Sequence, residues 1–337
     1  MFNKISIIGL GLIGGSIAKA LRANLPDCHI GAFDTNHSCL EDALAHSAIV
    51  RMFHSLDEAV TNTELIILCC PLQHYATIGR HIDKHSLSST LVTDAGSVKS
   101  YAIEALDMIK DRYVPAHPIA GSQQHGFSAS TAHLFIGKRI FLTPTADVSK
   151  DKVEAIKALW QQTGASEVAT IDADKHDATY AAVSHLPQAL SFCEPSSLDS
   201  LYTSSLMKQH RRISKSHCGL WADIFIANRH HLLPLLRNAL SIIKDSEHPE
   251  DHQPSSQQKV NWVAYTTAKT VQKLAGSLVE DFAGSGYHDF ISVLQGTVEQ
   301  VNIHQRQQLV INIQHLTEAI NNESIQDIAQ AIIHPIG

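Results

Sequence analysis

Short apolar runs alternate with amphipathic stretches through the first half of the chain. The apolar runs predict buried strands over residues 4–8, 29–34, 64–70, 90–94, 112–116 and 139–143. Apolar residues recur at helical spacing between them, for example over 12–25, 101–110 and 151–163. Alternation of strands and helices predicts a parallel, doubly wound α/β sheet.

The pattern changes at about residue 172. Long helical stretches then dominate, over 173–192, 219–244, 259–281 and 298–321, and runs of β-branched residues become scarce. The polar, proline-bearing stretch 246–258 is typical of a connection between helices. The sequence therefore predicts two domains: an α/β domain over residues 1–171 and an all-α domain over residues 172–337.

Composition and charge exclude several classes of protein. A length of 337 residues suits two domains, and a net charge of −7 implies no broad basic surface for a nucleic acid. No apolar run is long enough to span a membrane. The six cysteines form no C-x-x-C pair, and no Cys/His cluster has zinc spacing. We therefore expect a cytoplasmic protein without a metal site.

The first strand is followed by the sequence GLGLIG, which opens the first helix. The first glycine permits a tight turn, the second lets a pyrophosphate approach the backbone, and the third lets helix and strand pack closely. Amides at the start of the helix then face the phosphate. The alternative is that this glycine loop is a tight turn that binds no ligand. The residues expected to bind the cofactor here are Gly9, Gly11, Leu12, Ile13 and Gly14.

An acidic residue ends the second predicted strand at the distance that this loop requires. Asp34 lies about 20 residues after Gly14, where a carboxylate accepts hydrogen bonds from the adenosine ribose and repels a 2′-phosphate. No arginine follows in 35–37, so NAD is favoured over NADP. The alternative role of Asp34 is to cap a helix. Cys70 and Pro71 end the third long strand beside the expected path of the nicotinamide.

Further motifs follow in an order that resembles prephenate dehydrogenases. They lie at 94–99, 117–126, 137–144, 176–177, 184–187, 212–213 and 221–228, and the resemblance is dense from residue 4 to about 245. It implies a Rossmann-type NAD(P)-binding domain followed by a helical dimerisation domain, hence a homodimer. Members of this family act on prephenate, on arogenate or on both.

The resemblance also implies a reaction and its residues. The expected reaction is the NAD-dependent oxidative decarboxylation of prephenate to 4-hydroxyphenylpyruvate, a step of tyrosine biosynthesis. His117 matches the catalytic histidine, and Ser97 matches a residue that contacts it and the nicotinamide. Arg212 matches the arginine that pairs with the ring carboxylate, with Arg211 as the alternative. Other residues expected to bind the substrate are Ser122, Ser184, His185 and Gln188.

Structural roles compete with several of these assignments. Ser97 after Gly96 could cap a helix, His185 could be a buried helix histidine, and Arg212 could lie on a solvated helix face. Prephenate is favoured over arogenate as the substrate, because residues 122–125 include no carboxylate that could pair with the ammonium group of arogenate. Two other functions stay open: a β-hydroxyacid dehydrogenase, which usually needs a helix-borne lysine, and a cofactor-sensing protein without catalysis.

Overall fold

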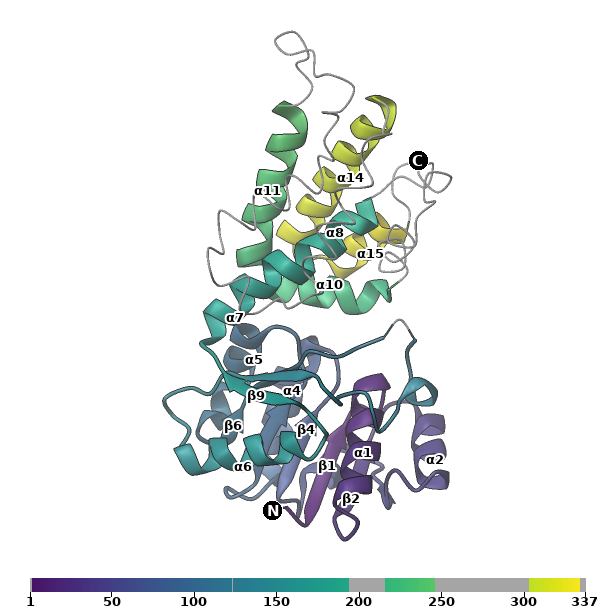
Figure 1. Ribbon diagram of the computed structural model, residues 1–337, viewed down its shortest axis with the longest axis vertical. Coiled ribbons are helices and arrows are strands. Elements are labelled where there is room, and N and C mark those ends of the chain that lie inside the picture. The colour runs from purple at the N-terminus through teal and green to yellow at the C-terminus, as the bar shows by residue number, and fades with distance from the viewer. Residues whose placement is uncertain (1, 123, 194–215, 246–302, 334–337) are drawn as a thin grey trace. The chain divides into compact units, whose positions relative to one another are not determined.

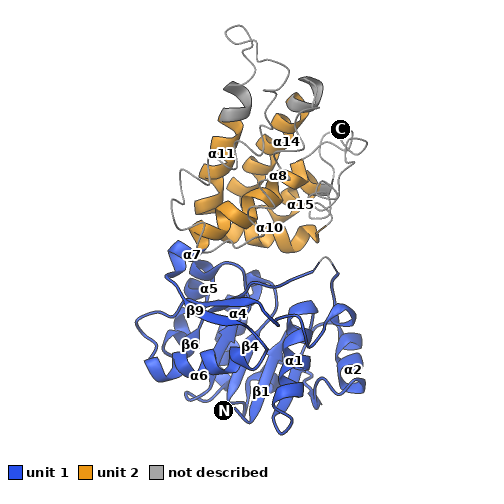
Figure 2. Cartoon of the chain, in the orientation of Figure 1, with its two compact units in different colours: residues 1–176 blue, residues 177–337 orange. Residues whose placement is uncertain are grey.

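The structure is a computed structural model that describes residues 2–122, 124–193, 216–245 and 303–333. The chain divides into two compact units, residues 1–176 and 177–337 (Figure 2). The division follows His176, a few residues beyond the point where the sequence pattern changes. No helix among the described residues is long and apolar enough to cross a membrane.

Unit 1 is built on a six-stranded sheet in the order β3-β2-β1-β4-β5-β6. All neighbouring strands run parallel, which confirms the predicted doubly wound, Rossmann-type sheet. The order reverses between β1 and β4, and ligands of such sheets bind beyond the carboxyl ends of the strands at this point. The strands are β1 (Lys4–Ile8), β2 (His29–Phe33), β3 (Arg51–Met52), β4 (Leu65–Leu68), β5 (Leu91–Asp94) and β6 (Tyr113–Val114).

Helices cover this sheet (Figure 1). Every residue of β4 is buried, as a parallel strand with both faces covered requires. The helix expected over 101–110 is instead α5 followed by the 3-10 helix η2, with Ile109 outside helical geometry. The helices are α1 (Leu12–Asn24), α2 (His37–Ala45), α3 (Leu56–Val60), η1 (Leu72–His74), α4 (Tyr75–His85), α5 (Lys99–Ala105), η2 (Asp107–Arg112), η3 (Phe127–Ala129) and α6 (Lys150–Gln161).

A second, three-stranded sheet completes unit 1. It consists of β7 (Ala116–Pro118), β8 (Arg139–Leu142) and β9 (Glu167–Thr170). The strand β7 pairs antiparallel with β8, which pairs parallel with β9. The predicted strand over 112–116 is therefore two short strands, β6 and β7, which belong to different sheets.

Every described element that lies within unit 2 is helical, and α7 (Ala173–Tyr180) crosses from unit 1 into it. The helix predicted over 219–244 is interrupted at Asn228, and the one over 259–281 lies outside the described residues. Buried apolar side chains of α8, α10, α11 and α14 form one core. The elements are η4 (Ala181–His185), α8 (Leu186–Cys193), α10 (Cys218–Ala227), α11 (Arg229–Asp245), α14 (Ile303–Asn321) and α15 (Ile325–Ile333).

Candidate active site

The glycine loop between β1 and α1 is shaped by close packing against the end of β4. Gly9 has a positive φ of +94°, and a Cβ there would lie 2.6 Å from the carbonyl oxygen of Cys69. A Cβ on Gly14 would lie 2.0 Å from the carbonyl oxygen of Gly9. Both positions therefore need glycine for the protein's own packing, as the sequence predicts.

Gly11 differs from these two glycines. It has an ordinary negative φ of −77° and takes the N-cap position of α1, without a side-chain cap. A Cβ there would meet nothing within 4 Å. No residue that the structure describes requires glycine at this position, whereas a phosphate lying over the helix amides would.

This contrast gives a matched pair of substitutions. Gly14→Ala is expected to lower the free energy of unfolding by about 1–3 kcal/mol or more, because the methyl group overlaps a backbone oxygen. Gly11→Ala should cost no more than about 1 kcal/mol, the usual difference between glycine and alanine at an N-cap. Chemical denaturation of both variants measures this. Equal losses would show that the space above Gly11 is filled when the protein is in solution.

Asp34 follows β2 and supports the glycine loop. Its Oδ2 accepts a hydrogen bond of 2.7 Å from the Leu10 amide, and its Oδ1 accepts one of 2.8 Å from the Asn36 amide. The helix α2 is capped by Asn36, whose side chain accepts from the Ser38 amide. The alternative role of Asp34 as a helix cap is therefore wrong. A carboxylate offers about four acceptor sites, so Asp34 still has capacity for ribose hydroxyls.

Cys70 and Pro71 follow β4, the strand beside β1 at the point of reversal. The Cys69 amide donates to the Ile8 carbonyl oxygen at 2.7 Å, which extends the β1–β4 pairing beside the glycine loop. Burial raises the pKa of the Cys69 thiol, which favours its protonated form. Cys70 is half-buried and Pro71 is exposed, ahead of η1.

A fully buried ion pair lies at the end of β5. Lys99 Nζ is 2.6 Å from Asp94 Oδ2, and neither side chain has any solvent exposure. The same oxygen accepts from the Tyr75 hydroxyl at 3.0 Å and from the Gly96 amide at 2.9 Å. Burial raises the pKa of Tyr75, so its hydroxyl keeps the proton that it donates. Three donors inside the protein therefore satisfy Asp94 Oδ2.

This pair also holds both backbone groups of Ala116. The Ala116 amide donates to Asp94 Oδ1 at 2.9 Å, and Lys99 Nζ donates to the Ala116 carbonyl oxygen at 2.7 Å. His117 is the next residue. The ion pair thus joins the start of β7 to the carboxyl end of β5 and places His117 at that end. The sequence places both residues in a family motif but does not indicate that they bind to Ala116.

His117 is half-buried, and its imidazole faces a second histidine. Its Nδ1 lies 2.9 Å from Nε2 of His176, and the two rings meet edge to face, with centroids 5.1 Å apart. His176 is fully buried and packs edge to face against Phe141. One of the two facing nitrogens must carry the hydrogen, so the contact links the tautomers of both rings.

Ser97, Ser122 and Arg212 differ in what the structure describes of them. Ser97 is half-buried, and Val98 takes the N-cap position of α5, so the alternative role of Ser97 as a helix cap is wrong. Ser122 is exposed, and its hydroxyl oxygen accepts from the Gln124 amide at 3.0 Å. Arg212 and Arg211 lie outside the described residues.

Ser184 and His185 lie in η4, a π-helical turn of unit 2. Pro187 has no amide hydrogen to donate to the residue four positions earlier, which favours a widened turn here. His185 is buried, and its Nδ1 accepts from Nδ2 of Asn228 at 3.0 Å. Asn228 Nδ2 also donates to the Asp177 carbonyl oxygen at 2.8 Å. An amide nitrogen only donates, so the ring hydrogen of His185 is assigned to Nε2.

Gln188 lies on α8, directly after this turn. Its side chain is buried, and its Nε2 lies 3.5 Å from the Ser191 hydroxyl. Ser184 is half-buried. The two candidate residues with the most buried side chains, His185 and Gln188, thus contact other polar groups of unit 2.

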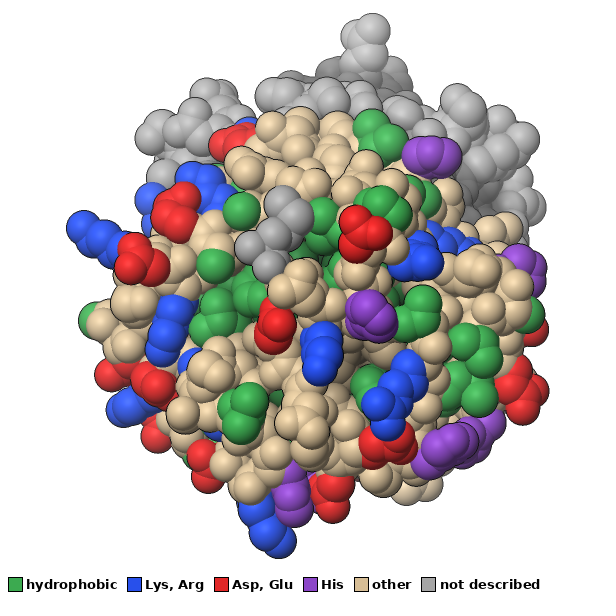
Figure 3. Space-filling view, turned by 90° about the horizontal axis from the view of Figure 1, so that it is seen from below, with side chains coloured by type: hydrophobic (Ala, Val, Ile, Leu, Met, Phe, Trp, Pro, Cys, Tyr) green, Lys and Arg blue, Asp and Glu red, His purple; other side chains and the backbone are tan. Residues whose placement is uncertain are grey.

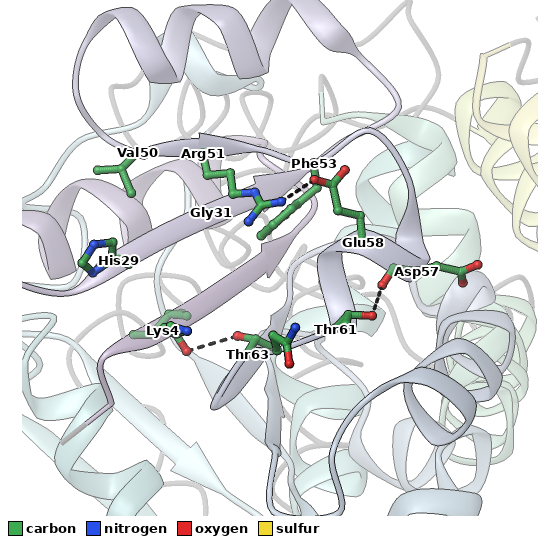
Figure 4. A pocket seen from close by; sticks show the side chains of 12 residues that line it. Lys4, His29, Gly31, Val50, Arg51, Phe53, Asp57, Glu58, Thr61 and Thr63 are labelled. Atoms are coloured by element: carbon green, nitrogen blue, oxygen red, sulfur yellow. Dashed lines mark hydrogen bonds and ion pairs between the residues drawn. The ribbon is translucent and has the colours of Figure 1, made fainter.

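A cavity of about 650 Å³ lies elsewhere in unit 1 (Figure 4). Its lining includes the first residues of β1 and β2 and the helix α3, and no predicted site residue lines it. Arg51 and Glu58 form a 2.7 Å ion pair within it. The face shown in Figure 3 mixes side chains of both charges.

The sheet order, the glycine loop and Asp34 together define a dinucleotide-binding fold of the kind found in dehydrogenases. The family model described as "Prephenate dehydrogenase, nucleotide-binding domain" matches residues 17–169. Over these residues the chain resembles the nucleotide-binding domain of prephenate dehydrogenases.

Relatives and solved structures show the same resemblance. The chain is 28% identical to a cyclohexadienyl dehydrogenase of Zymomonas mobilis over 256 residues, which cover 72% of this chain and 87% of the relative. It is 27% identical to a prephenate dehydrogenase of Bacillus subtilis, over 69% of this chain and 66% of the relative. A crystal structure of prephenate dehydrogenase from A. aeolicus, in complex with hydroxyphenyl propionate and NAD⁺, superposes with a TM-score of 0.64 and 25% identity, covering 81% of this chain and 98% of that one.

Proposed function

We propose that this chain is an NAD-dependent prephenate dehydrogenase. The ring carbinol carbon of prephenate loses a hydride, the electrons of the C–CO₂ bond enter the ring, and carbon dioxide leaves, which gives 4-hydroxyphenylpyruvate. The observation that carries the proposal is the placement of His117. The buried ion pair holds it at the carboxyl end of β5, in the sheet whose β1 leads into the glycine loop.

The proposed cofactor is NAD⁺, which accepts the hydride at C4 of its nicotinamide when it is bound. The room above Gly11 and the amides at the start of α1 suit a pyrophosphate. Asp34 suits the adenosine ribose and repels a 2′-phosphate. The A. aeolicus neighbour, 25% identical in sequence, was solved with NAD⁺.

The contact with His176 suits His117 to the role of base. For Nε2 of His117 to accept the carbinol proton, its Nδ1 must carry the ring hydrogen and donate a hydrogen bond to His176 Nε2. The proton on Nε2 then returns to the same oxygen, which becomes the phenol hydroxyl of the product once carbon dioxide has left. His176 is then a positioning residue that selects this tautomer, and it is itself protonated on Nδ1. Ser97 follows Gly96, whose amide donates a hydrogen bond to Asp94. We propose that Ser97 contacts His117 and the nicotinamide.

Prephenate is proposed as the substrate because Ser122 and Gln124 offer no carboxylate to pair with the ammonium of arogenate. Arogenate is the second candidate, since the Z. mobilis relative is named a cyclohexadienyl dehydrogenase. Assays of the purified chain with each substrate and each cofactor decide between them. Equal or faster turnover of arogenate would contradict the choice of substrate, and no turnover of either would overturn the proposed function.

Asp34→Asn is expected to narrow the preference for NAD⁺ over NADP⁺. The amide keeps an oxygen that can accept from the Leu10 amide but removes the charge that repels a 2′-phosphate. The kcat/KM for each cofactor measures this, and the NADP⁺ to NAD⁺ ratio should rise in the variant. An unchanged ratio, or a wild type that prefers NADP⁺, would contradict the assignment of Asp34.

Arg212→Ala is expected to act mainly on KM for prephenate, because the family arginine pairs with the ring carboxylate. Removing one partner of a buried charge pair costs about 2–5 kcal/mol of binding. Arg211→Ala is the neighbouring control. If Arg211→Ala raises KM instead, the correspondence with the family is shifted by one residue.

A further inference from the structure

Two histidines of α4 and one aspartate of α3 converge on the surface of unit 1. His81 Nδ1 lies 2.6 Å from Asp57 Oδ1, and His85 Nε2 lies 3.5 Å from the same oxygen. One ligating atom from each of the three residues lies within 4.8 Å of the other two. We propose that Asp57, His81 and His85 form a binding site for a divalent transition-metal ion such as Zn²⁺.

The local structure explains why the three side chains meet. His81 and His85 are four residues apart on α4, so they project from the same face of the helix, and their rings stack with centroids 6.2 Å apart. The Ser55 side chain caps α3 and places Asp57 in its first turn. The sequence predicts no metal site, because its Cys/His spacings do not match zinc motifs and Asp57 lies 24 residues before His81.

The distances suit a tetrahedral ion after a small adjustment. Zinc lies about 2.0–2.2 Å from nitrogen and oxygen ligands, which places neighbouring ligands about 3.4 Å apart. The His85–Asp57 distance of 3.5 Å meets this value. The 2.6 Å contact between His81 and Asp57 is a hydrogen bond, which would have to open by about 0.8 Å to admit an ion.

The exposure of the three side chains permits this movement. The side chain of Asp57 is 52% exposed, that of His81 is 38% exposed and that of His85 is 30% exposed. The three side chains can therefore shift and leave a fourth ligand position for water. Three protein ligands with one open position is a usual zinc arrangement. Two imidazoles and a carboxylate also suit Co²⁺, which serves as a spectroscopic probe.

Charge sets an upper limit on the affinity. The hydrogen bond from His81 lowers the pKa of the Asp57 carboxyl, so this ligand is ionised at neutral pH. Lys84 places a positive charge near the same carboxylate and opposes a cation. We therefore expect weaker binding than at a buried structural zinc site.

A bound ion would join α3 to α4. Asp57 belongs to the lining of the cavity in Figure 4, and there its side chain points away from Arg51 and Glu58. An ion at this position would therefore stabilise unit 1 without depending on the glycine loop or on His117. Its detection does not need dehydrogenase activity, so the site and the proposed function are tested separately.

The test uses the full-length chain after treatment with a chelator. Titration with Co²⁺ should produce the visible absorption of a tetrahedral ion, and calorimetry with Zn²⁺ should give the affinity. His85→Ala and Asp57→Asn should each weaken binding by about tenfold to a hundredfold or more, since even residues that only orient a metal ligand have effects of that size. The control is His46→Ala: His46 is an exposed histidine whose Nδ1 contacts the Asp42 carbonyl oxygen of its own helix.

Thermal unfolding provides a second readout that reports on folding at the same time. Zn²⁺ should raise the Tm of the wild type and of His46→Ala, but not that of His85→Ala, while all three should unfold alike in chelator. The proposal is overturned if the wild type shows no tetrahedral Co²⁺ absorption. It is also overturned if His85→Ala and Asp57→Asn bind Zn²⁺ as tightly as the wild type, because other histidines then hold the ion.

Discussion

His117→Asn is expected to lower kcat for prephenate by about 10²–10⁴-fold, the usual contribution of a general base. Asparagine keeps a polar side chain but cannot take the carbinol proton. Because that proton moves only as the hydride departs, the loss should fall on kcat, while KM for NAD⁺ changes little. Steady-state kinetics of the variant measure both quantities.

Two further measurements separate a catalytic role from a structural one. The rate of the wild type should fall at acidic pH as the base becomes protonated, and this fall should be absent from the residual activity of His117→Asn. His133→Asn, which changes an exposed histidine of unit 1, should leave kcat unaltered. A His117→Asn variant with near-normal kcat would make His117 a structural histidine, and His185 would become the next candidate.

Lys99→Met is expected to lower both stability and activity. Methionine fills part of the same buried space but leaves the Asp94 carboxylate without its ion-pair partner. Breaking a buried pair in this way costs about 3–5 kcal/mol of folding free energy. The Ala116 carbonyl oxygen also loses the donor that holds it, and a displacement of about 1 Å at His117 can lower kcat by about 10²-fold.

Denaturant titration and steady-state kinetics of Lys99→Met measure the two effects. The control is Lys110→Met, which removes an exposed lysine 3.6 Å from Asp107, and exposed pairs contribute only about 0–1 kcal/mol. A Lys99→Met variant that is as stable as the control would show that the buried pair relaxes without cost. A stable variant with unaltered kcat would separate the pair from the placement of His117.

The strands β1, β2, β4 and β5 of the main sheet could be predicted from the sequence because each is a short apolar run between polar segments. The edge strand β3 could not be predicted, because it has only two residues and one of them is Arg51. The strand β7 could not be predicted, because it has only three residues and one of them is Pro118, which has no amide hydrogen to donate. Its place in a second sheet depends on pairing with β8, which lies more than 20 residues later. The local pattern of apolar and polar residues cannot predict such a contact.

Interactions between distant segments explain the other differences. The helix predicted over 219–244 is interrupted at Asn228, whose side chain binds groups about 40 to 50 residues earlier. Lys99 is the first residue of α5, and its charged side chain is buried. A pattern of apolar and polar positions would instead place a lysine on the surface. The cofactor loop could be predicted because its glycines and Asp34 have a fixed spacing, whereas the contact of His117 with His176 joins residues 59 positions apart.

The bond from the Leu10 amide to Asp34 couples two properties that are usually changed independently. The carboxylate that would select the nucleotide also supports the loop that would hold it. Redesign of this scaffold toward NADP⁺ therefore cannot simply delete the acidic side chain. A replacement has to provide another acceptor for the Leu10 amide as well as a cation for the extra phosphate, so a change of coenzyme requires two compensations at once.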